Sequence, residues 1–107
     1  MIIDSHCHLN YDPMSQSLDK VISRANLDGV KYLLTISTEE KSFNKILEIV
    51  KKFSCVFGTF GIHPHEAKKH LSINSDQIIK KINSSRKIIG IGETGLDFYY
   101  NHSDKKD

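Results

Sequence analysis

Short apolar runs alternate along the chain with segments whose apolar residues recur every three or four positions. The runs cover residues 1–3, 31–36, 55–60 and 87–91, and turn residues bound each of them. Their centres lie roughly 30 residues apart, which is the length of a strand–helix–strand unit. Because parallel neighbours cannot be joined by a hairpin, this alternation predicts parallel strands connected by helices. The expected fold class is α/β, with the order β-α-β-α-β-α-β.

Each gap between the apolar runs predicts one helix. In the first gap, apolar residues follow the i, i+3, i+4, i+7 spacing and Gly29 supplies the stop signal. In the second, Ser37 and Glu40 stand three positions apart, which predicts a capping box. In the third, the candidate N-caps are the Asn-Ser-Asp residues at 74–76. The segments expected to be helical are 18–25, 43–50 and 75–82.

The composition narrows the class of protein. The chain has 107 residues, of which 38% are hydrophobic and 26% charged, and this fits one globular domain. Its formal net charge of +2 is far below that of a dedicated nucleic-acid-binding module. Neither a membrane-spanning apolar stretch nor a secretion signal is recognisable. With 2 cysteines, we expect reduced thiols and a cytoplasmic location.

A pair of histidines follows the first apolar run. His6 and His8 stand two positions apart, so in an extended chain they project to the same side. Two neutral imidazoles are a common start of a Zn, Mn, Co or Fe site, which then needs a further ligand. Asp4 has the same parity and could line this face or orient an imidazole, whereas Cys7 points the other way, into the core. On their own, the two histidines would more often be surface residues without a ligand.

Polar residues also follow the third and fourth apolar runs. His63 and His65 follow the third run, again two positions apart, and Glu93 follows the fourth. In a parallel sheet all C-terminal strand ends lie on one side, where α/β proteins place their active sites. We therefore expect these side chains to lie near His6 and His8. Asp97 is expected to accept hydrogen bonds from its own loop rather than to bind a metal.

Three segments resemble the N-terminal signatures of the TatD-type deoxyribonucleases. They are Ile-Asp-Ser-His-Cys-His-Leu at 3–9, Gly-Ile-His-Pro-His at 61–65, and Gly-Ile-Gly-Glu-Thr-Gly-Leu-Asp-Phe-Tyr at 90–99. They occur in the order of that family and at similar spacing. The resemblance implies the first half, about four βα units, of a TIM-type (β/α)8 barrel with parallel strands. It also implies a metal-dependent hydrolase that acts on phosphodiesters.

The same resemblance implies roles for the polar residues. His6 and His8 would bind one divalent metal ion, and Glu93, the catalytic carboxylate, would bridge this ion to a second. His63 and His65 would bind the substrate near its phosphate. A complete site of the family holds two ions, and Mg, Mn and Zn cannot be distinguished from the sequence. The implied partner is DNA or another phosphodiester, and no membrane is expected.

A complete barrel needs about 250 residues, whereas this sequence ends shortly after its fourth predicted strand. We expect residues 1–100 to form the N-terminal half of a TatD-like barrel and the polar segment 101–107 to be frayed. The family's later ligands lie outside these residues, so the isolated chain is expected to be inactive. A complementary C-terminal half, or self-association, would cover the open strand edges.

Two other interpretations fit the same residues. The chain could be a non-enzymatic remnant of a split or decaying gene. It could also be half of an amidohydrolase acting on C–N bonds, since such enzymes begin their barrels with the same His-x-His. A resemblance to the two-metal amidohydrolases would imply a modified lysine at the end of the fourth strand, but this sequence has Glu93 there. The sequence therefore favours the nuclease-type hydrolase.

Overall fold

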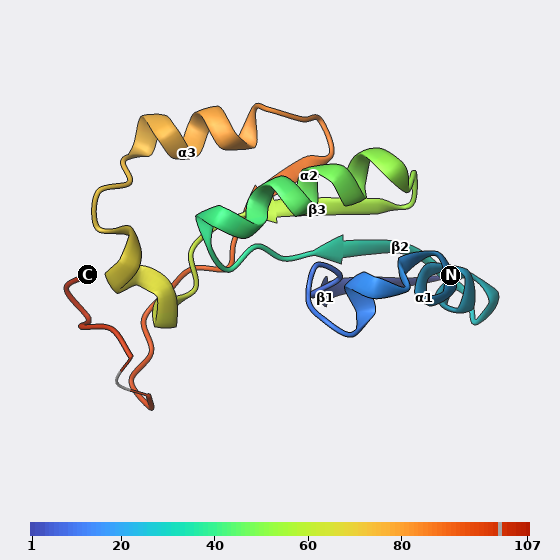
Figure 1. Ribbon diagram of the computed structural model, residues 1–107, viewed down its shortest axis with the longest axis horizontal. Helices are drawn as coiled ribbons and strands as arrows, with labels where there is room; N and C mark the ends of the chain where they lie inside the picture. Colours follow the sequence, from blue (N-terminus) through green and yellow to red (C-terminus); the bar gives the residue numbers. More distant parts are fainter. Residues whose placement is uncertain (101) are drawn as a thin grey trace.

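The computed structural model describes residues 1–100 and 102–107 and shows strands alternating with helices (Figure 1). The strands are β1 (Ile2–Cys7), β2 (Val30–Thr35), β3 (Val56–Phe60) and β4 (Ile88–Ile91). The helices are α1 (Leu18–Leu27), α2 (Phe43–Lys52) and α3 (Ser75–Ile82). Short 3-10 helices precede them as η1 (Met14–Gln16), η2 (Glu40–Ser42) and η3 (Pro64–His70). The predicted alternation of strands and helices is confirmed.

The strands form one parallel sheet in the order β1-β2-β3-β4, as the sequence predicts. Each strand pairs with the next one along the chain; Leu33 faces Val56, for example. β1 continues to Cys7, which pairs with Thr35, so His6 lies within the strand rather than after it. The apolar run at residues 1–3 is shorter than the strand itself, because β1 lies at an edge of the sheet, where polar side chains can face solvent.

The three helices form where the amphipathic spacing predicts them. α3 begins with a capping box between Asn74 and Gln77. The predicted capping box of Ser37 with Glu40 is wrong, because α2 begins only at Phe43, after η2. Ser37 is instead buried, and its hydroxyl donates to the carbonyl oxygen of Gly61 at 3.1 Å. A tertiary hydrogen bond has taken the place of the local cap.

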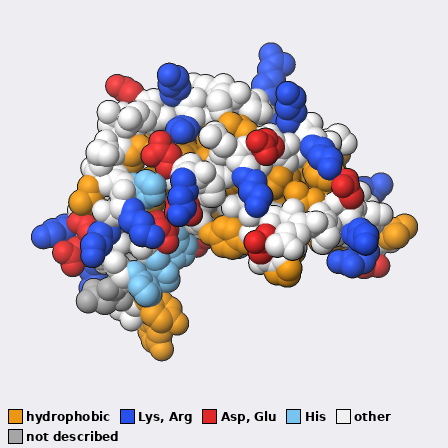
Figure 2. Space-filling view, viewed as in Figure 1, with side chains coloured by type: hydrophobic (Ala, Val, Ile, Leu, Met, Phe, Trp, Pro, Cys, Tyr) orange, Lys and Arg blue, Asp and Glu red, His pale blue; other side chains and the backbone are white. Residues whose placement is uncertain are grey.

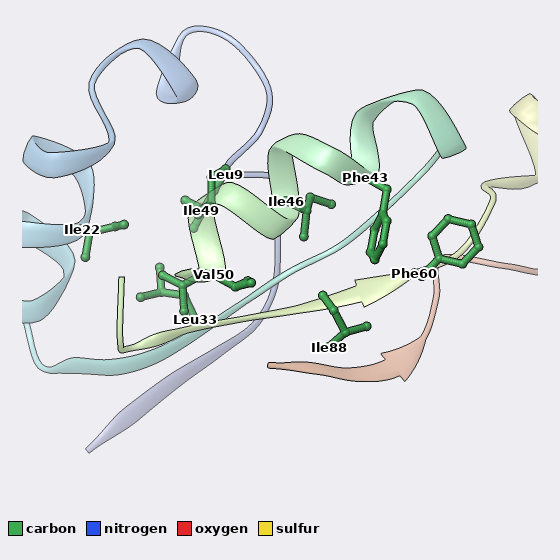
Figure 3. Packing of buried hydrophobic residues seen from close by; sticks show 10 residues of the cluster. Leu9, Ile22, Leu33, Phe43, Ile46, Ile49, Val50, Phe60 and Ile88 are labelled. Atoms are coloured by element: carbon green, nitrogen blue, oxygen red, sulfur yellow. The ribbon is translucent and has the colours of Figure 1, made fainter. Parts of the chain in front are cut away.

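The hydrophobic core lies between the sheet and the helices. Figure 3 shows Ile46 and Val50 of α2 pointing toward the strands below them. At one end of the core the rings of Phe43 and Phe60 meet edge to face, with centroids 4.8 Å apart. Each fully buried side chain of this size contributes about 1.5–3 kcal/mol. The buried members are Leu9, Ile22, Leu33, Phe43, Ile46, Ile49, Val50, Val56, Phe60 and Ile88.

The opposite face of the sheet is open. Tyr32 and Ile89 each adjoin a buried core residue in their strand, so they point away from the helices. Their exposed fractions are 45% and 60%. β1 and β4 lie at the ends of the strand order, so both present unpaired backbone groups along one side. In a closed barrel such a face becomes the interior and such edges pair.

The segment after β4 runs back along η3. The hydroxyl of Ser103 accepts a hydrogen bond from the backbone of Lys68 at 3.1 Å and donates to the carbonyl oxygen of His65 at 3.3 Å. Asn101 lies outside the described residues, and the frayed state of 101–107 stays a prediction. In the part of the chain that the structure describes, no helix is long and apolar enough to cross a membrane.

Candidate metal centre

Three of the predicted site residues meet at the C-terminal end of the sheet. His6 lies in β1, His8 follows that strand, and Glu93 follows β4. One ligand atom of each lies within 4.8 Å of the others, and Nε2 of His6 is 3.5 Å from Oε2 of Glu93. In a flat sheet β1 and β4 would be roughly 14 Å apart, at three strand spacings. The sheet therefore curls, as in a barrel wall, to bring its two edges toward one another.

The ring of His8 is held from two sides. Its Nδ1 lies 3.2 Å from the carbonyl oxygen of Ile36, which can only accept, and this contact assigns the proton to Nδ1. Nε2 then carries the lone pair that a metal ion requires. The ring also stacks on Tyr11, with centroids 5.1 Å apart and an angle of 15° between the planes. Both contacts fix the orientation of this imidazole.

Asp4 and Cys7 stay outside the group of metal-ligand candidates. Oδ1 of Asp4 accepts the backbone N–H of His6 at 3.1 Å, so it fixes the strand rather than an imidazole ring. Cys7 packs against the core, as expected, and its Sγ donates to the carbonyl oxygen of Leu34. Burial, and to a lesser extent the charge of Asp4, raises the pKa of the Cys7 thiol to about 12. The thiol is therefore protonated near neutral pH and is no nucleophile.

His63 turns toward Glu93. Nδ1 of His63 accepts the backbone N–H of His65 at 3.1 Å, so a neutral His63 carries its proton on Nε2. That Nε2 lies 3.4 Å from Oε1 of Glu93. The carboxylate of Glu93 thus has His63 beside one oxygen and His6 beside the other. Of the second histidine pair, His63 therefore lies next to the candidate metal ligands.

His65 turns instead toward Asp97. Its Nε2 pairs with Oδ2 of Asp97, while Oδ1 accepts the backbone N–H groups of Tyr99 at 2.8 Å and Tyr100 at 3.0 Å. The hydrogen bond from Tyr100, then those from His65 and Tyr99, lower the pKa of Asp97 to about 2. Asp97 is therefore an acceptor for its own loop, as expected, and it also orients His65.

These side chains surround an open pocket of about 350 Å³. Figure 2 shows histidine side chains gathered at one end of the molecule. The sequence did not single out Tyr11, Thr38 or Glu66, which also line the pocket; the hydroxyls of Tyr11 and Thr38 are hydrogen-bonded to one another. Each of these residues is close in sequence to a histidine pair or to a strand end, and this closeness is the signal by which the sequence could have identified them. The pocket is lined by His6, His8, Tyr11, Thr38, His63, His65, Glu66 and Glu93.

The donor set fits a divalent metal ion. Imidazole nitrogens and a carboxylate oxygen are the usual ligands of Zn and also suit Mn and Fe. At bond lengths of about 2.0–2.2 Å, two ligands of a tetrahedral ion lie roughly 3.3–3.6 Å apart. The 3.5 Å between His6 and Glu93 falls in this range. Three protein ligands leave a position for water or substrate, as in catalytic zinc sites.

The sequence matches a protein family over nearly its whole length. The model of the family described as "TatD related DNase" covers residues 3–107. The chain belongs to this TatD family. The predicted family resemblance is thereby confirmed.

Individual relatives agree with this assignment. An uncharacterized metal-dependent hydrolase of Buchnera aphidicola, BU355, is 37% identical over 113 residues. The 3'-5' ssDNA/RNA exonuclease TatD of Salmonella typhimurium is 29% identical over 102 residues and matches 95% of this chain. The crystal structure of the TatD homologue YjjV from Escherichia coli superimposes with a TM-score of 0.75 at 26% identity.

The chain spans about 40% of the length of these TatD relatives. It covers 43% of the Buchnera protein, 39% of the Salmonella exonuclease and 39% of the YjjV chain, while 94% of its own residues take part in the YjjV superposition. The four parallel strands are thus the N-terminal part of the TatD fold, which confirms the predicted fold class.

Proposed function

We propose that these residues form the N-terminal part of the active site of a metal-dependent phosphodiester hydrolase. His6, His8 and Glu93 hold a divalent metal ion. The observation that supports this most directly is the approach of their ligand atoms to within 4.8 Å of one another from the two edges of the sheet. The relatives named as metal-dependent hydrolases support the same assignment.

The residues around these ligands have separate tasks in this proposal. Glu93 has an imidazole beside each carboxylate oxygen. As the family resemblance implies, its carboxylate would be shared between the first ion and a second one. When bound, the metal activates a water molecule and neutralises charge on the phosphate. His63 and His65 bind the phosphate at the pocket mouth, with Asp97 holding the ring of His65.

Single-stranded nucleic acid is the substrate class we propose. The Salmonella relative is named as an exonuclease of single-stranded DNA and RNA. Next to Asp97, the rings of Phe98 and Tyr99 are 72% and 86% exposed. Exposed aromatic rings beside a phosphate site can stack on unpaired bases, which a duplex does not offer. We also propose a cytoplasmic location, in keeping with the free thiols of Cys7 and Cys55.

Cobalt binding tests the metal site directly. We expect Co²⁺ titration of the 107-residue polypeptide to give saturable visible absorption, and His6→Ala and Glu93→Gln to weaken the affinity by at least about tenfold. His102→Gln changes an exposed histidine outside the group and serves as the control. Absence of saturable binding, or equal binding by all variants, would refute the proposed site.

Catalysis by the isolated polypeptide is a separate question. The described residues supply three candidate ligands for one ion, and two-metal hydrolysis requires ligands for both ions. We therefore propose that the isolated chain is inactive until a complementary half, or a second copy, completes the barrel. Digestion of single-stranded DNA with Mg, Mn or Zn should show no cleavage that depends on His6 or Glu93. Robust cleavage that His6→Ala and Glu93→Ala both abolish would contradict this.

A further inference from the structure

We propose that Thr59 is a positioning residue for Glu93: its hydroxyl holds the peptide group that joins Gly92 to Glu93. This inference rests on the proposed role of Glu93 as a metal ligand. Thr59 lies in β3, is 5% exposed, and does not itself line the pocket of the candidate metal centre. It would act on the ion only through the backbone of the neighbouring strand end.

The hydroxyl of Thr59 makes two hydrogen bonds of opposite sense. It donates to the carbonyl oxygen of Gly92 at 2.6 Å and accepts the backbone N–H of Ser37 at 3.2 Å. A hydroxyl has one proton to donate, and a carbonyl oxygen can only accept, so the direction of both bonds is fixed. The bonds link the ends of β2, β3 and β4.

The same peptide group is held at its other side. The backbone N–H of Glu93 donates to the carbonyl oxygen of Ser37 at 2.7 Å. The carbonyl oxygen of Ser37 therefore accepts a hydrogen bond from this peptide, and the N–H of Ser37 donates one to the hydroxyl of Thr59. That hydroxyl donates in turn to the carbonyl oxygen of Gly92, which belongs to the same peptide. Three hydrogen bonds among Ser37, Thr59, Gly92 and Glu93 thus form a closed ring that includes the Gly92–Glu93 peptide, and both polar atoms of this peptide are satisfied.

Gly61 closes a third side of this peptide. A Cβ atom placed on Gly61 would lie 2.3 Å from the carbonyl carbon of Gly92 and 2.7 Å from the amide nitrogen of Glu93. Backbone approaches this close are possible only for glycine. The peptide thus lies against the backbone of the segment that follows β3, and it cannot shift in that direction.

This arrangement fixes the Cα of Glu93 where its side chain is otherwise only loosely held. The contacts of the carboxylate to His6 and His63 are 3.5 Å and 3.4 Å long. Its position is therefore determined mainly by the backbone. Removing groups that orient a metal ligand typically costs tenfold to a hundredfold in affinity. Losing the Thr59 hydroxyl also leaves the carbonyl of Gly92 and the N–H of Ser37 without their partner.

The test compares Thr59→Val, which keeps the shape of the side chain, with Thr59→Ser, which keeps the hydroxyl. We expect Thr59→Val to weaken Co²⁺ binding at least tenfold and to accelerate hydrogen exchange of the Glu93 amide about tenfold. Thr59→Ser should keep both the Co²⁺ affinity and the exchange rate of the Glu93 amide near the wild-type values. Ile49→Val, in the buried core and outside the ring, is the control for loss of general stability. Ile49→Val should leave the Co²⁺ affinity unchanged. It should also leave the exchange rate of the Glu93 amide unchanged once any loss of global stability has been taken into account.

Several outcomes overturn the proposal. Wild-type Co²⁺ affinity in Thr59→Val would do so, as would equal losses in Thr59→Val and Ile49→Val. If the wild-type chain binds no Co²⁺, the proposed metal site fails, and unchanged Glu93 amide exchange in Thr59→Val would separately refute the role of the ring. If Thr59→Val does not fold, Thr59→Ala, which removes the hydroxyl without adding an atom, is compared with Thr59→Ser in its place. Thr59→Ala should produce the same loss of affinity, and wild-type affinity there would equally refute the inference.

Discussion

The imidazole of His65 and the carboxylate of Asp97 are paired across two loops that follow different strands. His65 belongs to η3, after β3, and Asp97 lies beyond β4. The second carboxylate oxygen accepts two backbone N–H groups from the residues that follow Asp97. This one side chain therefore joins the outer loops of the pocket, and its ionised form is the one that the fold stabilises.

Replacing Asp97 by Asn should destabilise the fold in a pH-dependent way. The pKa of Asp97 is lowered from 3.8 to about 2 in the folded state, so its contribution is complete above the unfolded pKa and is lost as the pH falls through the folded one. Thermal melting should show a lower Tm for Asp97→Asn at pH 6, and a difference that narrows between pH 4 and pH 2. Asp28→Asn, at an exposed carboxylate after α1, should leave the Tm almost unchanged. A difference that stays constant over this pH range would contradict the assignment.

Gly58 should not tolerate a methyl group. A Cβ at this position would lie 2.8 Å from Cγ2 of Ile46 and 3.0 Å from Cδ1 of Ile88. Overpacking of this kind costs about 1–3 kcal/mol. Urea denaturation should reveal this loss for Gly58→Ala. The matched substitution Gly90→Ala meets only Cγ2 of Thr59 at 3.8 Å, an ordinary contact, so it should be much better tolerated.

Truncating Ile46 should show how much the core depends on α2. Ile46 is fully buried, whereas Ile79 of α3 is 54% exposed. Ile46→Ala is expected to lower the free energy of unfolding by about 2–5 kcal/mol, because it removes buried methyl groups and leaves a cavity. Ile79→Ala should change it by about 0.5 kcal/mol or less. Equal effects in chemical denaturation would show that the core is not packed around Ile46.

The open edges of the sheet should make the isolated polypeptide self-associate. β4 has one strand neighbour, and its Ile89 is 60% exposed on the face opposite the helices. A charged side chain on an edge strand opposes pairing with another chain. Sedimentation velocity should show oligomers for the wild type and a larger monomer fraction for Ile89→Lys. Leu27→Lys, which changes an exposed leucine at the end of α1, should not alter the distribution. A monodisperse wild-type monomer would be evidence against association through the edges.

The sequence predicted the parts of the fold and site that depend on periodicity. Alternating apolar runs and helical spacings specified the parallel sheet, and the positions of His6, His8 and Glu93 at strand ends specified which side chains would meet. What it could not predict depends on contacts between distant segments. Ser37 has the local pattern of a helix cap, yet its neighbours Gly61 and Thr59 arrive from 22 to 24 residues away. The stacking of Tyr11 on His8 likewise leaves no trace in the hydrophobic pattern.

The approach of His6 to Glu93 has a consequence for the unfolded chain as well. These residues belong to the first and the last strand, so an ion held by both would close a loop of roughly 90 residues, and cross-linking such a loop removes several kcal/mol of chain entropy from the unfolded state. The bound ion would therefore stabilise the whole sheet by linking its first strand to its last. Metal binding and folding would be thermodynamically coupled. When the ion is scarce, the population of unfolded chains would rise, and proteases would degrade the protein faster.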